Sequence, residues 1–290
     1  MRRLVVVCAA LLALAGTGIR PASGAASSAA LSTPPSGSGY LLAATDGGVF
    51  AFGHRFHGSA AGLRLNRPVV GIAATSDGDG YWLVASDGGV FAYGDARFRG
   101  SAGGLRLNAP VVGIASTPDG GGYWLLALDG GVFAFGDAGY FGSMAGLDIL
   151  GSPVGMVSTS DGRGYEILTT TGEVFSFGDA LAPGAPPAVQ FALPGASRYA
   201  GIARVNGTVR GYVVVTGDGA QRFGGDAQAC TAVEATVAGR PAIVGVATPN
   251  TSECTRWLAA SDGGVFAFLA PFHGSASNLA LHGPIVGIAS

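Results

Sequence analysis

A phrase that recurs at nearly constant spacing along the chain constrains its fold more than any other feature. The phrase reads GYWLVASDGGVFAYGDA from Gly80 and GYWLLALDGGVFAFGDA from Gly122. One turn position can be followed through six copies, which are Asp46, Asp87, Asp129, Thr171, Asp218 and Asp262. The steps between them are 41, 42, 42, 47 and 44 residues. A fixed period of this length predicts a repeat architecture in which every copy forms one supersecondary unit.

Each copy has the pattern of a small antiparallel sheet. From Val111, the apolar run VVGIAST is followed by a Pro-Asp-Gly-Gly turn, the run GYWLLAL, an Asp-Gly-Gly hairpin turn and the run VFAFG. Asp and Gly favour these turns because they accept left-handed backbone conformations. The segment YFGSM then predicts a short fourth strand, before a loop that leads to the next copy. Four strands in about 42 residues are typical of one blade of a β-propeller.

The order of the phrases predicts how the two ends of the repeat region meet. The region begins at Gly39 with the second strand of a copy, and it ends at Ser290 with a separate first strand, PIVGIAS. Pairing these two fragments completes one sheet and leaves no open inner edge. We therefore predict an all-β fold, a six-bladed β-propeller of four-stranded blades, closed by pairing the C-terminal strand with the N-terminal blade.

The chain divides into three predicted parts. Residues 1–25 have two arginines, an apolar run and a small-residue cleavage region, which is the pattern of a secretory signal peptide. Residues 26–38 form a flexible Ser/Pro/Gly linker, and residues 39–290 form the propeller. Removing residues 1–25 changes the formal net charge from −2 to −5, which argues against nucleic acid as a partner. We expect a secreted, extracellular monomer, associated with the cell wall or free, with no membrane span after cleavage.

Two cysteines remain after the signal peptide, Cys230 and Cys254. An even pair in an exported chain predicts one disulfide, here joining blades five and six where the repeat is most degenerate. Two thiols without a neighbouring histidine cannot complete a tetrahedral metal site, so we predict no metal.

The repeated aromatic and acidic residues each have two interpretations. Tyr81, Trp82, Tyr123, Trp124 and Trp257 could stack on sugars, but their recurrence in every copy favours packing between blades. The repeated aspartates lie in turns, where their side chains bond the backbone two residues ahead. Asp77-Gly-Asp79-Gly resembles part of a calcium loop, although the later bidentate acid is absent.

Nothing in the sequence matches a nucleophile elbow, a zincin motif or a dinucleotide fingerprint. Some six-bladed propellers are hydrolases with a metal in the central tunnel, and these need acids or amides on the innermost strands. Here those strands read VVGIA, PVGMV, YAGIA and IVGVA, with no acid in any of them. The sequence thus favours a protein that is not an enzyme and uses no cofactor.

The residues just before each innermost strand vary from copy to copy, and repeat proteins usually vary their binding face. We predict that they surround one mouth of the tunnel and bind a carboxylate, phosphate or sugar. A solvated rim without a ligand is the alternative. The candidate residues are Asn66, Arg67, Asn108, Arg198, Arg240 and His282.

The phrase GYWLVASDGGVFAYGDARFRGS, followed by LNAPVVGIASTPDG, resembles the repeats of secreted actinobacterial proteins, a largely uncharacterised group. In that group similar repeats stand alone or beside cell-wall hydrolase or peptidase domains. The resemblance covers Gly39 to Ser290 and implies an extracellular β-propeller.

We therefore expect a secreted non-enzymatic β-propeller binding module, with a cell-wall glycan or another exported protein as its ligand. The alternative is a propeller hydrolase of the lactonase or esterase type with a site at the tunnel mouth. A third reading is a structural spacer without a partner. The fold itself does not decide between them, because ring folds host unrelated activities.

Overall fold

The computed structural model describes residues 39–181, 188–191, 197–227, 230, 242–249 and 254–290, so the predicted signal peptide and linker lie outside the described part. The described residues form strands joined by tight turns, with one short 3₁₀ helix, η1 (Gly225–Ala227), and no α-helix. The strands are β1 (Tyr40–Ala44), β2 (Val49–Phe52), β3 (Val69–Ala74), β4 (Gly80–Ala85), β5 (Val90–Gly94), β6 (Val111–Ser116), β7 (Gly122–Ala127), β8 (Val132–Gly136), β9 (Pro153–Ser158), β10 (Gly164–Thr169), β11 (Glu173–Gly178), β12 (Ala188–Gln190), β13 (Tyr199–Arg204), β14 (Tyr212–Thr216), β15 (Gln221–Gly224), β16 (Ile243–Ala247), β17 (Arg256–Ala260), β18 (Val265–Phe268) and β19 (Ile285–Ala289).

These strands form six antiparallel sheets, as the six copies of the repeat predict. Five sheets have three strands and one has four; their orders are β19-β1-β2, β3-β4-β5, β6-β7-β8, β9-β10-β11-β12, β13-β14-β15 and β16-β17-β18. Within each sheet the strands follow the order of the phrases, and only β19 joins a sheet from the other end of the chain. An all-β fold built from repeated antiparallel sheets is confirmed.

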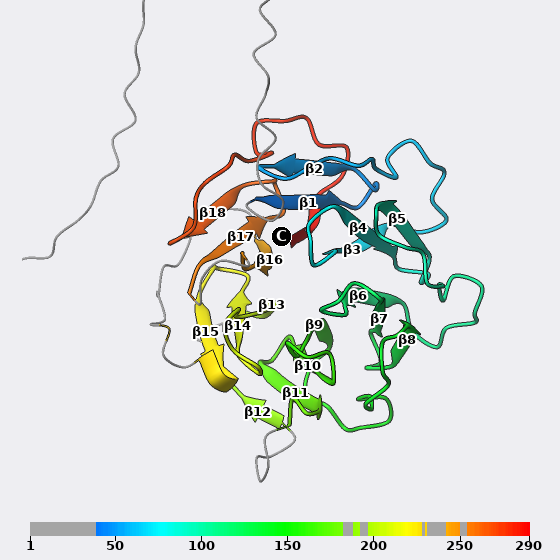
Figure 1. The fold of residues 1–290 in the computed structure, drawn as a ribbon, viewed down its shortest axis with the longest axis vertical. Helices are drawn as coiled ribbons and strands as arrows, with labels where there is room; N and C mark the ends of the chain where they lie inside the picture. The colour runs from blue at the N-terminus through cyan, green and yellow to red at the C-terminus, as the bar shows by residue number, and fades with distance from the viewer. Residues whose placement is uncertain (1–38, 182–187, 192–196, 228–229, 231–241, 250–253) are drawn as a thin grey trace, which may run out of the picture. The chain divides into compact units, whose positions relative to one another are not determined.

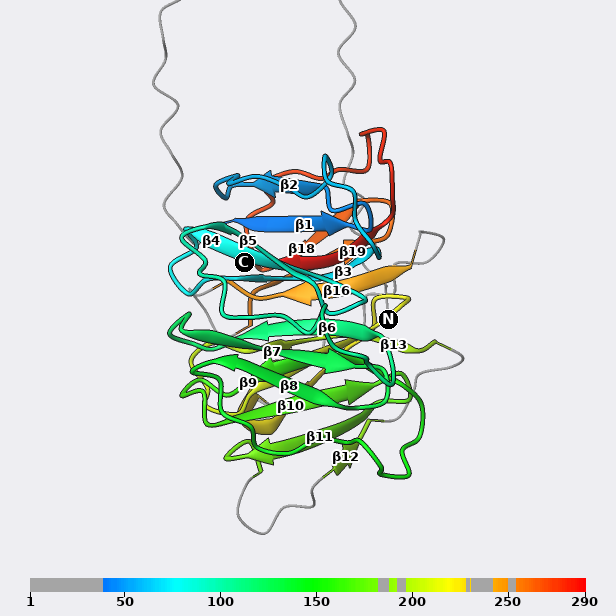
Figure 2. The ribbon, with the colours of Figure 1, turned by 90° about the vertical axis from the view of Figure 1, so that its right-hand side faces the viewer.

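The innermost strands contact one another in a cyclic order, which is β3, β6, β9, β13, β16, β19 and again β3. Figure 1 shows the six sheets following one another around a common centre, where the C-terminus lies close to β1 and β16. There β19 pairs antiparallel with β1, so that Ala289 faces Leu41 and Gly287 faces Ala43. Figure 2 shows β19 directly beneath β1 from the side. The predicted pairing of the last strand with the first sheet is therefore present.

The second strand of every copy is completely buried. Successive side chains of a strand point to opposite faces, so each of these strands contacts both neighbouring sheets. In β4, Tyr81 and Leu83 pack with the sheet of β1, whereas Trp82 and Val84 pack with the sheet of β7. Six such apolar clusters lie between consecutive sheets, including one between β17 and β1. The core is therefore a series of layers between the sheets.

The repeated aromatic residues belong to this core, as their recurrence predicts. Trp82, Trp124 and Trp257 have no exposed surface. Each contacts the tyrosine of the next copy, with ring centroids 5.1 to 5.6 Å apart. Each indole Nε1 also donates a hydrogen bond to a backbone carbonyl, as Trp82 does to Arg97 at 2.9 Å. Buried aromatics whose polar atom has a partner are stable core residues, so these side chains are unavailable to a sugar.

The predicted fourth strand is absent from five of the six sheets within the described residues; only β12 forms one. In four copies the segment after the third strand is irregular because a glycine takes a left-handed conformation there. Gly58, for example, has φ +128°, and a Cβ at this position would approach the Tyr93 ring to 2.9 Å. The equivalent glycines are Gly100, Gly142 and Gly274, with φ of +130° to +131°. This backbone cannot continue a regular ladder.

A tyrosine from the next sheet takes over the hydrogen bonding of this outer segment. The Tyr81 hydroxyl accepts from His57 N at 3.1 Å and donates to the Gly58 carbonyl at 2.5 Å. Tyr40, Tyr123 and Tyr165 bond the carbonyls of Gly274, Gly100 and Gly142 in the same way. We call each of these contacts a tyrosine latch. Since each latch crosses from one sheet to the next, it ties consecutive repeats together at their outer edge.

Candidate functional site

The predicted rim residues lie in the loops that precede the innermost strands. Asn66, Arg67, Asn108, Arg198 and His282 are all exposed, and Arg240 lies outside the described residues. These loops share one side of the sheets with the hairpin turns, since Val69 N donates to the Thr45 carbonyl and Val111 N to the Ser86 carbonyl. Asn108 lines a shallow groove there together with Asp129 and Phe133. No recorded hydrogen bond or ion pair joins the described rim residues to one another, so their role as a site stays a prediction.

A cavity of about 200 Å³ lies at the other end of the innermost strands, which we call the tunnel cavity. Its lining includes residues from all six of these strands, for example Ile114, Met156, Val246 and Ile288 at one level. At the mouth, the cavity is lined by one residue from each innermost strand, which is either the last residue of the strand or the next one along the chain. These equivalent residues are Ala74, Ser116, Ser158, Arg204, Thr248 and Ser290. We call them the mouth ring.

Hydrogen bonds run around part of the mouth ring from one copy to the previous one. The Ser116 hydroxyl donates to the Ala74 carbonyl at 3.1 Å, and the Ser290 hydroxyl donates to the Thr248 carbonyl at 2.8 Å. The Thr248 hydroxyl donates to the Arg204 carbonyl at 2.5 Å. These bonds connect strands that lie in different sheets, so they fix the diameter of the mouth. They also hold the backbone of Arg204 in place.

Inner-strand glycines explain why the cavity is narrow. A Cβ on Gly201 would lie 3.1 Å from the Gly245 Cα, and a Cβ on Gly287 would lie 3.2 Å from an Ile72 methyl carbon. Both distances are tighter than ordinary contacts between carbon atoms. Glycine at this position therefore lets β13 approach β16 and β19 approach β3 closely around the centre.

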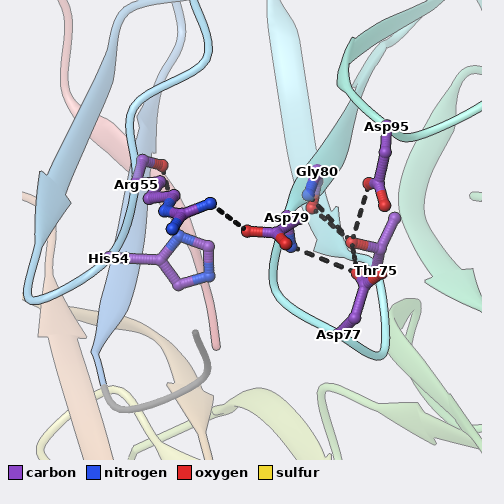
Figure 3. Close-up of polar contacts among 7 residues, drawn as sticks. All are labelled: His54, Arg55, Thr75, Asp77, Asp79, Gly80 and Asp95. Carbon is purple, nitrogen blue, oxygen red and sulfur yellow. Dashed lines mark hydrogen bonds and ion pairs between the residues drawn. The ribbon is translucent and has the colours of Figure 1, made fainter. Parts of the chain in front are cut away.

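The first turns of the copies carry a repeated cluster of a threonine and two aspartates, beside the cavity mouth (Figure 3). The Thr75 hydroxyl lies 2.7 Å from Asp77 Oδ1 and 3.4 Å from Asp95 Oδ1. It also accepts from Gly80 N at 2.9 Å, while Asp77 accepts from Asp79 N at 3.1 Å. The equivalent clusters are Thr117, Asp119 and Asp137, and Thr159, Asp161 and Asp179. Asp77, Asp119 and Asp161 accept a bond from the backbone N–H two residues ahead, so their predicted turn role is confirmed. Asp95, Asp137 and Asp179 instead lie within hydrogen-bond distance of the threonine hydroxyl.

The two carboxyl groups of the Thr75 cluster differ in acidity. The hydrogen bond from Thr75 lowers the pKa of Asp77, whereas burial and the neighbouring Asp77 raise the pKa of Asp95. Arg55 forms an ion pair with Asp79 at 3.0 Å beside this cluster, between exposed side chains. Burial lowers the pKa of the adjacent His54 (Figure 3). Within the described residues, no group of three or more His, Cys, Asp and Glu side chains is arranged to hold a metal ion. The clusters therefore serve the turns.

The hairpin aspartates have the predicted role as well. Asp46, Asp87 and Asp129 each accept a hydrogen bond from the backbone N–H two residues ahead, at 2.9 to 3.1 Å. Asp262 accepts the equivalent bond from Gly264 N at 2.9 Å. This local bonding explains the recurrence of these aspartates without a ligand.

Four aromatic side chains at equivalent positions are exposed on the outer segments. They are Phe56, Phe98, Tyr140 and Phe272, which are 58 to 63% exposed. Each lies two residues before the glycine that accepts a tyrosine latch. These four side chains were not among the sequence-based candidates, because the aromatic residues weighed there as ligand contacts all lie in the second strand of a copy. An aromatic residue repeated in a segment with a left-handed glycine is the signal that could have found it.

The structure also identifies Arg204, which the sequence analysis did not single out. It occupies the mouth ring at the end of β13, where the other copies have alanine, serine or threonine. Its Nη2 donates to Asn206 Oδ1 at 3.1 Å, and Asn206 Nδ2 donates to the Pro249 carbonyl at 2.7 Å. The sequence signal for this residue is that five copies have a small residue at this position of the repeat and one copy has an arginine.

The predicted disulfide is present between Cys230, which follows η1, and Cys254, which precedes β17. It connects the fifth and sixth copies, as expected. At this junction Arg256 occupies the position of the latch tyrosine, and it is buried between the Phe223 and Phe268 rings. Its Nη1 donates to the Cys254 carbonyl at 2.6 Å, and burial lowers its pKa to about 10. The covalent bond thus occurs where no tyrosine latch can form.

We expect the Cys230→Ser and Cys254→Ser double variant to lose roughly 3 kcal/mol of unfolding free energy, the value typical of a loop of this length. Thermal unfolding of the variant, and of the wild type with and without reductant, measures the effect. An unchanged melting temperature in both comparisons would show that the disulfide does not stabilise this junction.

Comparisons with known proteins bear on the fold alone. No protein-family model matches the sequence, and no curated protein matches it either. Among solved structures, the chain is similar to a propeller chain from the crystal structure of a nidogen/laminin complex, with a TM-score of 0.54 and 10% sequence identity. The similarity covers 87% of this chain and 97% of that one. No helix of the described residues is long and apolar enough to span a membrane. The all-β, propeller-like architecture is thereby supported from outside the sequence.

Proposed function

We propose that the chain is a closed six-bladed β-propeller that is secreted and acts as a non-enzymatic binding module. Its proposed partner is an exported protein or a glycan of the cell wall. The cyclic contacts of the innermost strands and the pairing of β19 with β1 support the closed ring. The apolar run of residues 1–25 and the resemblance of the repeats to secreted actinobacterial proteins support the location.

The observation that carries the binding function is the set of four exposed aromatics, Phe56, Phe98, Tyr140 and Phe272. Burying a large apolar side chain is favourable by about 1.5 to 3 kcal/mol, so leaving four of them in water at matched positions has a cost for the isolated protein. Aromatic side chains are enriched at protein interfaces, and they also stack on sugar rings. A repeated contact residue further allows one extended partner to bind several copies at once.

The structural neighbour adds one point in favour of a protein partner. That chain was solved in a complex of nidogen with laminin. At 10% sequence identity, that complex is a property of the neighbour. It is nevertheless a reason to include exported proteins among the candidate partners in the binding experiment.

The test replaces the four aromatics together, as Phe56→Ala, Phe98→Ala, Tyr140→Ala and Phe272→Ala. Binding is measured by cosedimentation with purified cell-wall material and by affinity measurements against the host's exported proteins. We expect the variant to lose at least about tenfold in affinity for the partner that the wild type binds, because a factor of ten needs only 1.4 kcal/mol. The assay that shows this loss identifies the partner as glycan or protein.

A matched control replaces four exposed leucines at equivalent positions, Leu63, Leu105, Leu147 and Leu279, which are 52 to 58% exposed. This control removes comparable apolar surface from another part of each copy, and we expect binding to be retained. Equal binding by the wild type and the aromatic variant would refute the proposed contact, and so would a wild type that binds neither class of partner.

A further inference from the structure

The tunnel cavity contains a cation whose charge the surrounding residues do not balance. Its lining includes no aspartate or glutamate, and Arg204 is its one charged side chain. The ion pairs recorded among the described residues are formed by Arg55, Arg163 and Arg210, so Arg204 has none within that part of the chain.

The guanidinium of Arg204 is half-buried, and burial lowers its pKa, although a guanidinium stays charged at neutral pH. Moving a charge out of water without a counter-charge is unfavourable. Asn206 is the one side chain recorded as a hydrogen-bond partner of this guanidinium among the described residues. Asn206 is itself held by its hydrogen bond to the Pro249 carbonyl, so it fixes the direction of the Arg204 guanidinium. It accepts from Nη2 alone, which leaves the other guanidinium N–H groups available to a ligand.

The position of Arg204 shows that the scaffold does not require a cation. Four other copies have a serine or threonine in the mouth ring, at Ser116, Ser158, Thr248 and Ser290. Three of these hydroxyls complete hydrogen bonds between neighbouring strands. The unpaired charge of Arg204 therefore serves no evident structural need that a serine at this position would not meet.

We propose that the tunnel cavity is a binding site for a small oxyanion, a carboxylate or phosphate group, held by the Arg204 guanidinium. The planar guanidinium donates two parallel hydrogen bonds to such a group, and a cavity with few competing charges strengthens the attraction. The Ser158 hydroxyl, next in the mouth ring, lines the same cavity. At about 200 Å³ the cavity is smaller than the roughly 300 to 1,000 Å³ pockets of drug-sized ligands, so the ligand is a small solute. This site is separate from the exposed aromatics and does not depend on their role.

The experiment compares the full mature protein with an Arg204→Ser variant, which places the residue of three other copies at this position. Titrations with sodium phosphate and with sodium acetate are followed by the chemical shift of the arginine Nε–Hε groups and by the melting temperature. Sodium chloride at the same ionic strength controls for general screening. We expect saturable binding of at least one oxyanion by the wild type, with a rise in melting temperature, and at least a tenfold weaker response from the variant.

Two further measurements separate a lost site from a damaged fold. Without any oxyanion, the melting temperature of Arg204→Ser is expected to equal or exceed that of the wild type, since the variant removes an unpaired half-buried charge. An Arg64→Ala variant, which removes an exposed cation that does not line the tunnel cavity, is expected to bind the oxyanion like the wild type. Identical titrations of wild type and Arg204→Ser, or a wild-type response that chloride reproduces, would overturn the proposal.

Discussion

A variant that lacks residues 284–290 is expected to show no cooperative unfolding transition. Deletion removes β19, which contributes Ile285, Ile288 and Ala289 to the buried core. It also exposes the edge of β1 and the sides of β3 and β16, which β19 contacts. Domains are typically stable by a free energy of unfolding of roughly 5 to 15 kcal/mol. The stabilising free energy lost with three buried side chains and the hydrogen bonds of one strand exceeds this margin. Circular dichroism and differential scanning calorimetry measure the outcome.

A circular permutant provides the matched control. The antiparallel pairing places Ala289 opposite Leu41, so Ser290 and Gly39 can be joined by the turn sequence Thr-Pro-Asp-Gly-Gly that follows Ser116 in its own copy. New ends are opened between Gly103 and Gly104, both exposed. We expect this permutant to fold and to melt at or above the temperature of the wild type. A stable truncated protein, or a permutant that fails to fold, would contradict the closed ring.

Stability is expected to fall as the pH rises from about 5 to about 9, and Glu166 is the main cause. This carboxyl is buried in β10 at the position where three other copies have tryptophan, facing the fifth copy. Burial raises its pKa to about 8, with Asp179 and Asp226 adding to the rise and Arg210 opposing it. In the unfolded chain the pKa is near 4.5. Between these values the folded protein keeps a proton that the unfolded chain has lost.

The sign follows from this difference in bound protons. Below about pH 4.5 the carboxyl is neutral in both states, and the full stability is present; as the pH rises towards 8, unfolding releases a proton and becomes more favourable. Each pH unit is worth about 1.4 kcal/mol, which gives a limit of about 5 kcal/mol. Glu166→Gln is expected to remove this slope. The difference in pH dependence between wild type and variant is the quantity to measure, because every other titratable group is the same in both proteins.

A second substitution at the same site separates charge from packing. Glu166→Ala also removes the pH slope, but it leaves a cavity and is expected to lower the stability at pH 5 by about 2 kcal/mol. Glu166→Gln keeps the volume and is expected to match the wild type at pH 5. If the Gln variant showed the same loss of stability between pH 5 and pH 9 as the wild type, the slope would have another origin.

The number of sheets and their antiparallel type could be predicted from the sequence, because every copy repeats the same alternation of apolar runs and turn residues. The pairing of β19 with β1 could be predicted from the position of a single unpaired phrase, and the disulfide from an even pair of cysteines. The burial of Trp82, Trp124 and Trp257 could also be predicted, because a residue that recurs at the same position of several copies fills the same space in each of them.

The fourth strand could not be predicted correctly from strand propensity. YFGSM is aromatic and short, but Gly142 adopts φ +130° beneath the Phe177 ring, and the Tyr165 hydroxyl takes its carbonyl. That geometry depends on side chains of the next sheet, which local sequence does not reveal. The cavity was missed for a related reason. It lies at the end of the innermost strands opposite the predicted rim, and Arg204 is a departure within one copy that a search for repeated residues passes over.

The tyrosine latch has a consequence for how the molecule matures. Four junctions can close as soon as their side chains meet, since a phenol and a backbone carbonyl need no further chemistry. At the junction beside Arg256 the Cys230–Cys254 bond is the extra tie, and this bond needs an oxidant to form. A newly made chain kept under reducing conditions would therefore lack this covalent bond while its four tyrosine latches are already formed. Formation of the disulfide then reports that the chain has reached an oxidising environment.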